Sequence, residues 1–295
     1  MDVSEIPCYI MTFNRSFDNQ PTYNHMRGHS RVVFVCSTDD PYLGKFKEEC
    51  TEEILVFDKA DYVYSDEENG DTHGLEYPYN QCGVFARRFL DDYTQRNGVK
   101  RFIVADNDLK MSVKMCDRKM LKFSDYPYAV DFAIQLYFYL LEKYDFLQYV
   151  TATNSGIEMM GKLYDIGFYF LPASLNFHLS RKPCRWISRL NDDFITPMKI
   201  LENEGRLSLN LPIIKVDQAS IVGTGDMSRV YKAVYEKYKN SPLMKDCTIT
   251  DESKRGVRTV LVIYNEKFYP GSTKKGKLQR SLVLRSILEK RSSSL

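Results

Sequence analysis

The chain has 295 residues, of which 43% are hydrophobic, 27% charged and 13% aromatic, and this composition excludes a disordered, collagen-like or low-complexity protein. The net charge of +2 hides an asymmetry, because residues 253–295 contain 11 Lys and Arg against 2 Asp and Glu, whereas the first 252 residues contain 30 against 37. The two parts therefore carry net charges of +9 and −7. We expect one compact domain over residues 1–252 and a basic segment over residues 253–295 that packs on it or extends from it.

The first 110 residues alternate between apolar strands and helices. A helix is predicted where Phe85, Phe89 and Leu90 recur at helical spacing, over residues 83–95. Strands are predicted over residues 6–12, 31–36, 53–57 and 101–105. Near-continuous apolar strands separated by helices are typical of a parallel sheet covered on both faces. We therefore predict an α/β fold with a Rossmann-type, mostly parallel sheet flanked by helices.

The second half of the chain is less regular. Helices are predicted over residues 128–144, 192–202, 226–238 and 278–290. Strands are predicted over residues 177–180 and 259–264, with two short strands within residues 207–216 that are separated by Pro212. The helix over residues 128–144 is the most apolar, but it is too short and too polar to cross a bilayer.

Seven cysteines, an odd number and none in a C-x-x-C pair, favour reduced thiols over a disulfide framework or a structural zinc site. The acidic N-terminus has no features of a signal peptide. We expect a soluble cytoplasmic protein with no membrane partner.

Two carboxylates, Asp106 and Asp108, follow the apolar strand over residues 101–105. Residues two apart in an extended segment point the same way, so both side chains can face one ligand. Carboxylate oxygens are suited to Mg²⁺ or Mn²⁺, which also takes phosphate oxygens. The alternative is an Asx-rich turn that merely ends a strand. The position after a buried strand favours a site for a metal ion and a nucleotide diphosphate.

The order of several motifs resembles the phage TET/JBP-associated glycosyltransferases, which have a GT-A-type fold. The resemblance covers residues 6–110 well and residues 150–230 loosely, and the basic segment after Ser253 has no counterpart in it. The motifs are the run IPCYIMTFNRSFDNQPTYNHM, the apolar strand followed by Asp-x-x-Tyr at Val32–Tyr42, the Gly83-x-x-x-Arg87 helix start, Ala105-Asp106-Asn107-Asp108, and Asn191-Asp192-Asp193-Phe194.

The resemblance implies that residues 1–252 form a GT-A-like nucleotide-sugar transferase domain. Its expected activity is transfer of a sugar, glucose or arabinose, from a UDP-sugar onto 5-hydroxymethylcytosine or a related modified pyrimidine in double-stranded phage DNA. Such a modification protects the DNA from host nucleases, and the enzyme of a phage would work in the host cytoplasm. The rival functions are a GT-A transferase with a protein, lipid or glycan acceptor, and a non-catalytic nucleic-acid-binding protein.

The same resemblance assigns roles at the donor site. Asp106 and Asp108 are expected to hold Mn²⁺ or Mg²⁺, with Asp106 also facing the donor. The donor nucleotide is expected to contact Thr12, Asn14, Arg15, Asp18 and Arg87. The alternatives are a surface ion pair for Arg15, a helix N-cap for Asp18 and a solvated side chain for Arg87. Only one of Arg87 and Arg88 can face the sheet edge, and we favour Arg87.

The acceptor side of the site is expected from the later motifs. Asp192 or Asp193 would take the proton from the acceptor hydroxyl in an inverting enzyme, or stabilise the donor sugar in a retaining one. A favourable helix dipole would explain one of these two residues without catalysis. Trp186 would stack on a sugar or a flipped base, or fill a structural position. DNA phosphates would contact Lys274, Lys275, Lys277 and Arg280, unless these lie in a solvated basic terminus.

Overall fold

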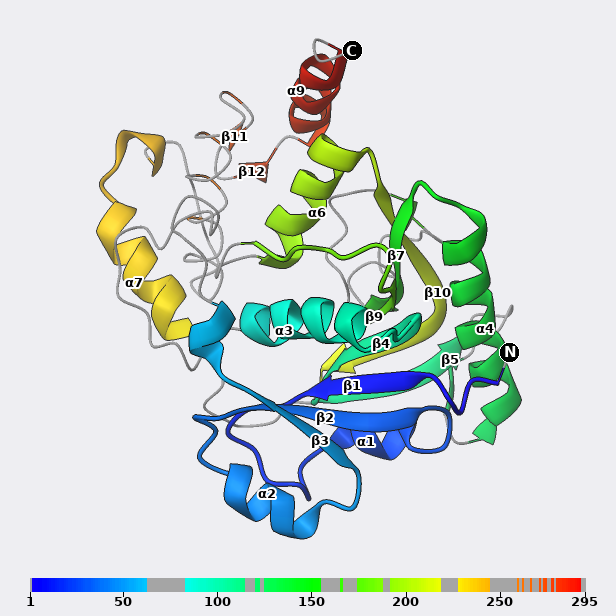
Figure 1. Cartoon of the computed structure of the whole chain (residues 1–295). Helices are drawn as coiled ribbons and strands as arrows, with labels where there is room; N and C mark the ends of the chain where they lie inside the picture. The colour runs from blue at the N-terminus through cyan, green and yellow to red at the C-terminus, as the bar shows by residue number, and fades with distance from the viewer. Residues whose placement is uncertain are drawn as a thin grey trace.

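The structure is a computed structural model that describes residues 2–62, 83–114, 120–122, 125–154, 165–166, 174–187, 192–218, 228–244, 273–274, 277–278 and 280–292, together with residues 259, 262, 266 and 271. One large sheet with helices on both of its faces dominates it (Figure 1). Its strands are β1 (Pro7–Met11), β2 (Arg31–Ser37), β3 (Glu53–Phe57), β4 (Arg101–Asp106), β5 (Leu109–Lys114), β6 (Met120–Lys122), β7 (Leu147–Asn154), β8 (Asp165–Ile166), β9 (Leu175–Leu179) and β10 (Leu207–Gln218).

The described helices lie around this sheet. They are α1 (Pro21–Met26), α2 (Leu43–Glu49), α3 (Gly83–Arg96), α4 (Pro127–Lys143), α6 (Asp192–Glu204), α7 (Ser228–Tyr238) and α9 (Arg280–Ser292), with short 3₁₀ turns η1 (Lys59–Tyr62) and η4 (Pro242–Met244). A separate two-stranded sheet joins β11 (Thr273–Lys274) to β12 (Lys277–Leu278).

The strand order in the large sheet is β3-β2-β1-β4-β9-β7-β10-β5-β6, and β8 pairs with β10. Strands β1 to β4 are mutually parallel, and β7 is parallel to β10. Strand β9 lies antiparallel between β4 and β7, and β5 and β8 are antiparallel to β10. Because β6 is antiparallel to β5, seven of the ten strands (β1–β4, β6, β7 and β10) run in one direction. The predicted α/β fold with a mostly parallel sheet is confirmed.

Alternate residues of the central strands fill two cores, one on each face of the sheet. Ile103 and Phe177 belong to the core that contains side chains of α1, α2 and α4. Tyr9 and Phe102 belong to the other core, which contains side chains of α3 and the indole of Trp186. This alternation follows from the two-residue period of a strand, and it brings α3 and the segment around Trp186 to the same face.

Most predicted elements are confirmed within two or three residues, but two predictions are wrong. Residues 207–218 form one strand, and its pairing with β7 shifts register between Leu211 and Lys215. Pro212 has no N–H to donate to the sheet, and it lies within this irregular part of the pairing. The strand nevertheless continues past Pro212. The strand predicted over residues 259–264 is also wrong, because the described residues Thr259 and Val262 are helical and buried.

The C-terminal helix packs on the body of the protein. Helix α9 contacts α6, Ile287 is fully buried, and Lys290 Nζ lies 2.7 Å from Glu202 Oε1. The division at residue 252 stays a prediction. Among the described residues, no helix combines the length and the apolar character that a transmembrane segment requires.

Candidate functional site

The carboxyl ends of the parallel strands β1, β2 and β4 meet at one edge of the sheet. Met11, the last residue of β1, is opposite both Val35 of β2 and Asp106 of β4. Ligands of parallel α/β sheets bind at this edge. The structure therefore brings together the two sequence segments with most of the predicted donor-site residues, residues 12–18 and 106–108.

A buried hydrogen-bond network fixes the turn that carries the acidic pair. Thr12 Oγ1 accepts hydrogen bonds from Gln20 Nε2 and from Asn107 Nδ2, both at 3.0 Å. Thr22 Oγ1 donates to the carbonyl oxygen of Asp106 at 2.5 Å and accepts from the amide of Leu109 at 2.9 Å. Asn107 is thus the structural residue of the turn.

The two flanking carboxylates are more accessible than Asn107. The side chains of Asp106 and Asp108 are 31% and 17% exposed, and each faces an arginine. Arg15 Nη2 lies 3.4 Å from Asp108 Oδ2, and Arg87 Nη2 lies 3.9 Å from Asp106 Oδ1. The edge therefore holds two carboxylates and two guanidinium groups, in two long and hence loose ion pairs.

Of the two adjacent arginines on α3, Arg87 is the one that faces the sheet edge, as expected. Arg88 is 1% exposed, and it donates to the carbonyl oxygens of Trp186 at 2.7 Å and of Tyr62 at 2.8 Å. The role of Arg87 in donor binding stays a prediction, whereas Arg88 has a structural role.

Asn14 and Asp18 are the other two predicted donor-site residues that follow β1. Asn14 has a left-handed backbone with φ of 55°, and its amide donates to Asp40 Oδ1 at 3.2 Å. Asp18 is exposed, and Gln20 occupies the N-cap position of α1, so the helix-cap alternative for Asp18 is wrong. Burial raises the pKa of Asp40, although the amides of Tyr42 and Asn14 oppose this shift.

Sequence reasoning missed a cluster at the ends of β2 and β3. Lys59 Nζ lies 2.9 Å from the Asp39 carboxylate and 3.9 Å from the centroid of the Phe13 ring, and Lys59 is only 7% exposed. The available signal was similar to that for Asp106, since Asp39 and Lys59 each lie two residues after the end of an apolar strand.

Trp186 is 3% exposed and forms the floor beneath Arg87, whose guanidinium carbon lies 4.7 Å from the indole centroid. Its ring also lies 6.4 Å from that of His178, a buried histidine whose pKa burial lowers to about 3. This environment favours the structural alternative for Trp186, and contact with an acceptor stays a prediction.

Helix α6 begins with the two predicted acidic residues. Asp193 is half-buried, and the side chain of Asp192 lies outside the described residues. The pKa of Tyr149 is raised well above its ordinary value, first by burial, while the negative charge of Asp193 adds to the shift and the positive charge of Arg87 opposes it.

The predicted DNA-contacting residues are placed only by their elements. Lys274 lies on β11, Lys277 on β12 and Arg280 at the start of α9, with side chains outside the described part of the chain. Lys275 lies outside the described residues altogether. No group of three or more His, Cys, Asp or Glu side chains suited to a metal ion occurs among the described residues.

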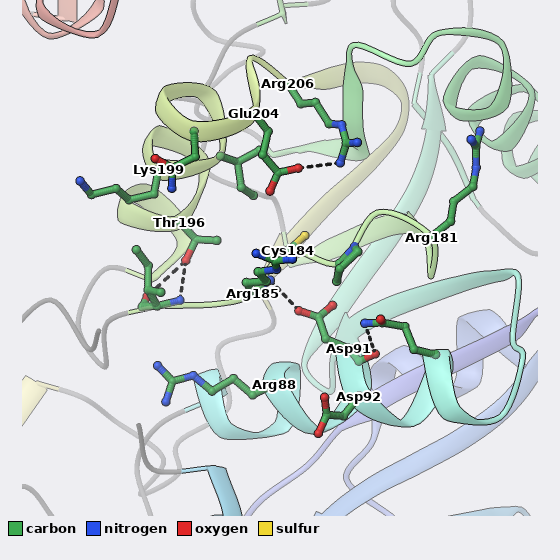
Figure 2. A pocket seen from close by; sticks show the side chains of 15 residues that line it. Arg88, Asp91, Asp92, Arg181, Cys184, Arg185, Thr196, Lys199, Glu204 and Arg206 are labelled. Carbon is green, nitrogen blue, oxygen red and sulfur yellow. Dashed lines mark hydrogen bonds and ion pairs between the residues drawn. The ribbon is translucent and has the colours of Figure 1, made fainter. Parts of the chain in front are cut away.

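A pocket of about 1070 Å³ opens between α3, residues 181–187 and α6 (Figure 2). It is separate from Asp106 and Asp108, which do not line it. Its lining residues are Arg88, Asp91, Asp92, Gln95, Arg181, Pro183, Cys184, Arg185, Ile187, Thr196, Lys199, Ile200, Asn203, Glu204 and Arg206.

The sequence matches no protein-family model and no curated protein. Among solved structures, the fold is similar to the crystal structure of glucosyl-3-phosphoglycerate synthase from Mycobacterium tuberculosis in complex with Mg²⁺ and uridine diphosphate. That similarity has a TM-score of 0.41 and a sequence identity of 9%, and it covers 80% of this chain and 78% of the other.

Proposed function

We propose that the protein is a metal-dependent glycosyltransferase that moves a sugar from a UDP-sugar onto 5-hydroxymethylcytosine or a related modified pyrimidine in DNA. The observation that carries this proposal is the pairing of Asp106 and Asp108 with Arg87 and Arg15 at the carboxyl edge of parallel strands. The resemblance of motif order adds the donor and acceptor classes.

The acidic pair fits a divalent cation. Both side chains supply hard oxygen ligands and are partly exposed, and one or two protein carboxylates are what Mg²⁺ takes when phosphates and waters complete its coordination. Asp106 and Asp108 would hold the cation. When bound, it would neutralise the charge that develops on the departing nucleotide diphosphate.

Arg15 and Arg87 would bind the donor diphosphate. Both guanidinium groups are largely shielded from water, with side chains 15% and 11% exposed, so their attraction to phosphate is weakly screened. Their ion pairs with Asp108 and Asp106 are long, at 3.4 Å and 3.9 Å. Loose pairs leave the arginines able to exchange a carboxylate for a phosphate.

The acceptor hydroxyl needs a base in an inverting reaction. Asp193, which is half-buried at the start of α6, is one candidate. Asp192 is the neighbouring alternative. In a retaining reaction the same carboxylate would orient or stabilise the donor sugar.

The decisive experiment is mass spectrometry of hydroxymethylcytosine-containing duplex DNA after incubation with Mn²⁺ and a panel of UDP-sugars, including UDP-glucose and UDP-arabinose. We expect a sugar adduct with the wild-type protein and none with Asp106→Asn or Asp108→Asn. Asp145→Asn is the matched control, because that carboxylate is 86% exposed and remote in the sequence from these motifs.

Two outcomes would overturn the proposal. Transfer to glycan, lipid or protein acceptors but not to modified DNA would leave a transferase with another acceptor. DNA binding without turnover of any donor, and without effect of Asp106→Asn or Asp108→Asn on donor binding, would leave a non-catalytic nucleic-acid-binding protein.

A further inference from the structure

The pocket in Figure 2 is lined by neither residue of the acidic pair. On α3 its lining begins at Arg88 and continues to Gln95, near the end of the helix that precedes β4. Arg181 follows β9, which is antiparallel to β4, so it belongs to the edge where β4 begins, opposite the edge with Asp106. A volume of about 1070 Å³ is enough for a small organic ligand.

Positive charge predominates among the side chains that face this pocket. Two of its charged residues, Arg88 and Asp91, are buried against the backbone of residues 184–186. The other lining charges are four cations, Arg181, Arg185, Lys199 and Arg206, and two carboxylates, Asp92 and Glu204. The pocket surface therefore has a net positive charge, which favours an anionic ligand.

Three of the four cations already have carboxylate partners. Arg181 lies 3.6 Å from Asp145, Lys199 lies 2.8 Å from Glu202, and Arg206 lies 2.7 Å from Glu204. Within the described part of the chain, the guanidinium of Arg185 makes no ion pair or hydrogen bond. Arg185 is therefore the group that is available to a ligand.

The fold holds Arg185 in a costly conformation. Its φ of 49° lies in the left-handed region, which costs an arginine of order 1 kcal/mol or more. The carboxylate of Asp91 compensates by accepting the Arg185 amide at 2.9 Å, and Figure 2 shows this bond from α3. Asp91 thus fixes the backbone at Arg185, and the Arg185 side chain itself is exposed.

We propose that this pocket binds a small phosphate monoester, with Arg185 as the principal phosphate ligand. Arginine presents a planar fork of N–H donors that matches phosphate oxygens. The neighbouring Lys199 and Arg206 add positive potential, and Asn203 and Glu204 offer partners to hydroxyl groups on the organic part of the ligand. The inference concerns a second site and does not depend on the proposed transferase activity.

Trp186 provides a direct readout, because it is the only tryptophan in the chain and the residue after Arg185. The intact protein is titrated with inorganic phosphate and with glycerol 1-phosphate at constant ionic strength, and binding is followed by tryptophan fluorescence and by calorimetry. We expect saturable binding that Arg185→Ala weakens at least tenfold. Arg185→Asn should weaken it similarly, and Asn tolerates the left-handed backbone, so the fold is preserved.

Crossed variants separate this site from the donor site. Asp106→Asn should abolish the response to UDP with Mn²⁺ and leave phosphate-ester binding intact, whereas Arg185→Asn should do the reverse. Arg31→Ala is the control for loss of a surface arginine, since its side chain is 53% exposed on β2. Unchanged ester affinity in both Arg185 variants, an equal loss in Arg31→Ala, or a response to duplex DNA but not to the ester would each overturn the proposal.

Discussion

Arg87 and Arg88 are neighbours in the sequence, yet their guanidinium groups have different surroundings. Arg87 reaches the acidic edge above Trp186, whereas Arg88 is buried against two backbone carbonyl groups. A buried carbonyl that loses its only donor costs about 1–3 kcal/mol. Substitution of Arg88 should therefore affect mainly stability, and substitution of Arg87 should affect mainly ligand binding.

We expect Arg88→Met to lower the free energy of unfolding by about 2–4 kcal/mol, because it leaves the carbonyls of Trp186 and Tyr62 without their guanidinium donor. Arg87→Met should change stability by less than about 1 kcal/mol but weaken UDP binding. Urea unfolding and UDP calorimetry on both variants test this. Equal effects of the two substitutions on stability would contradict it.

Asp91 is the anchor of the segment that carries Arg185 and Trp186, and burial raises its pKa from 3.8 to about 7, against the opposing effect of backbone amides. Between these values the folded state holds a proton that the unfolded state has lost. The stabilisation from this proton is complete below about pH 4 and is lost as the pH rises to 7.

Asp91→Asn removes this titration and keeps an oxygen acceptor. We expect the unfolding free energy of the variant, relative to wild type, to rise by roughly 2–4 kcal/mol between pH 4 and pH 7. His178, with its pKa lowered to about 3 by burial, contributes the opposite slope in both proteins and cancels in the difference. A pH-independent difference in urea unfolding would contradict the expectation.

At the scale of elements, the acidic turn depends on a helix that precedes it by some 80 residues. Thr22 of α1 bridges the Asp106 carbonyl and the Leu109 amide through one hydroxyl group. The helix therefore fixes both ends of the turn through the backbone of the turn.

Thr22→Val should lower the unfolding free energy by about 1–3 kcal/mol, because a carbonyl and an amide lose their shared partner. It should also weaken Mn²⁺-dependent UDP binding by loosening the turn, and Thr22→Ser should restore both properties. Calorimetric titration and urea unfolding of the two variants provide the measurements. A valine variant with wild-type metal dependence would show that the turn is held without α1.

A tyrosine on α4 supports the irregular part of β10. Tyr137 Oη donates to the Leu211 carbonyl at 2.8 Å and accepts from the Ile214 amide at 3.1 Å, on either side of Pro212. The side chain thus provides the partners that the shifted strand pairing leaves out.

Tyr137→Phe keeps the ring and removes this bridge, so we expect a loss of about 1–3 kcal/mol in unfolding free energy. Hydrogen exchange at the Ile214 amide should become faster, because that amide loses its acceptor. Tyr139→Phe, a change on the exposed face of the same helix, is the control. Slow exchange at Ile214 in the Phe variant would contradict this role.

The elements that the sequence predicted well are those with a clear period. Strands β1 to β4 are continuous apolar runs, and α3 and α4 repeat apolar residues at helical spacing. Strand β7 was missed because Gln148, Thr151 and Thr153 interrupt its apolar residues, and its identity depends on pairing with β9 and β10. Local sequence patterns do not predict long-range strand pairing of this kind.

The same distinction applies to the site. The positions of Asp106, Arg15 and Arg87 follow from strand and helix ends, so sequence analysis brought them to one edge. The sequence shows Asp39 and Lys59 shortly after two apolar strands, but their contact with each other and with Phe13 depends on how the strand ends approach, which the sequence does not show. Sequence analysis could not predict the pocket at Arg185 either, because Asp91 and Arg185 are 94 residues apart in the chain.

At the scale of the whole molecule, acidic and basic charges are segregated along the chain. Residues 253–295 carry a net charge of +9, and α9 within them is anchored to α6 by Ile287 and Lys290. Removing this segment would therefore uncover part of the body. Neutralising its charges is the cleaner test of a contact with DNA.

Replacing Lys274, Lys275 and Lys277 together with glutamine should weaken duplex binding and reduce the slope of log affinity against log salt by about 2–3. UDP binding should be unchanged, because the acidic edge lies on the large sheet. Neutralising Lys232, Lys237 and Lys239 in or just after α7 is the matched control. An unchanged salt slope in the first variant would exclude these lysines from the DNA contact.

The pairing of β5 with β10 has a consequence for synthesis of the protein on the ribosome. β5 directly follows the acidic turn, yet its partner residues in β10 emerge about a hundred residues later. Until then, β6 is the one strand among the described residues that can pair with β5, although α1 already contacts it. A separation of this length slows formation of the contact with β10. The strand that follows the acidic turn would therefore be fully paired only late in translation, after β1 to β4 have formed the parallel half of the sheet. Activity in a nascent-chain assay should appear only once β10 has left the exit tunnel.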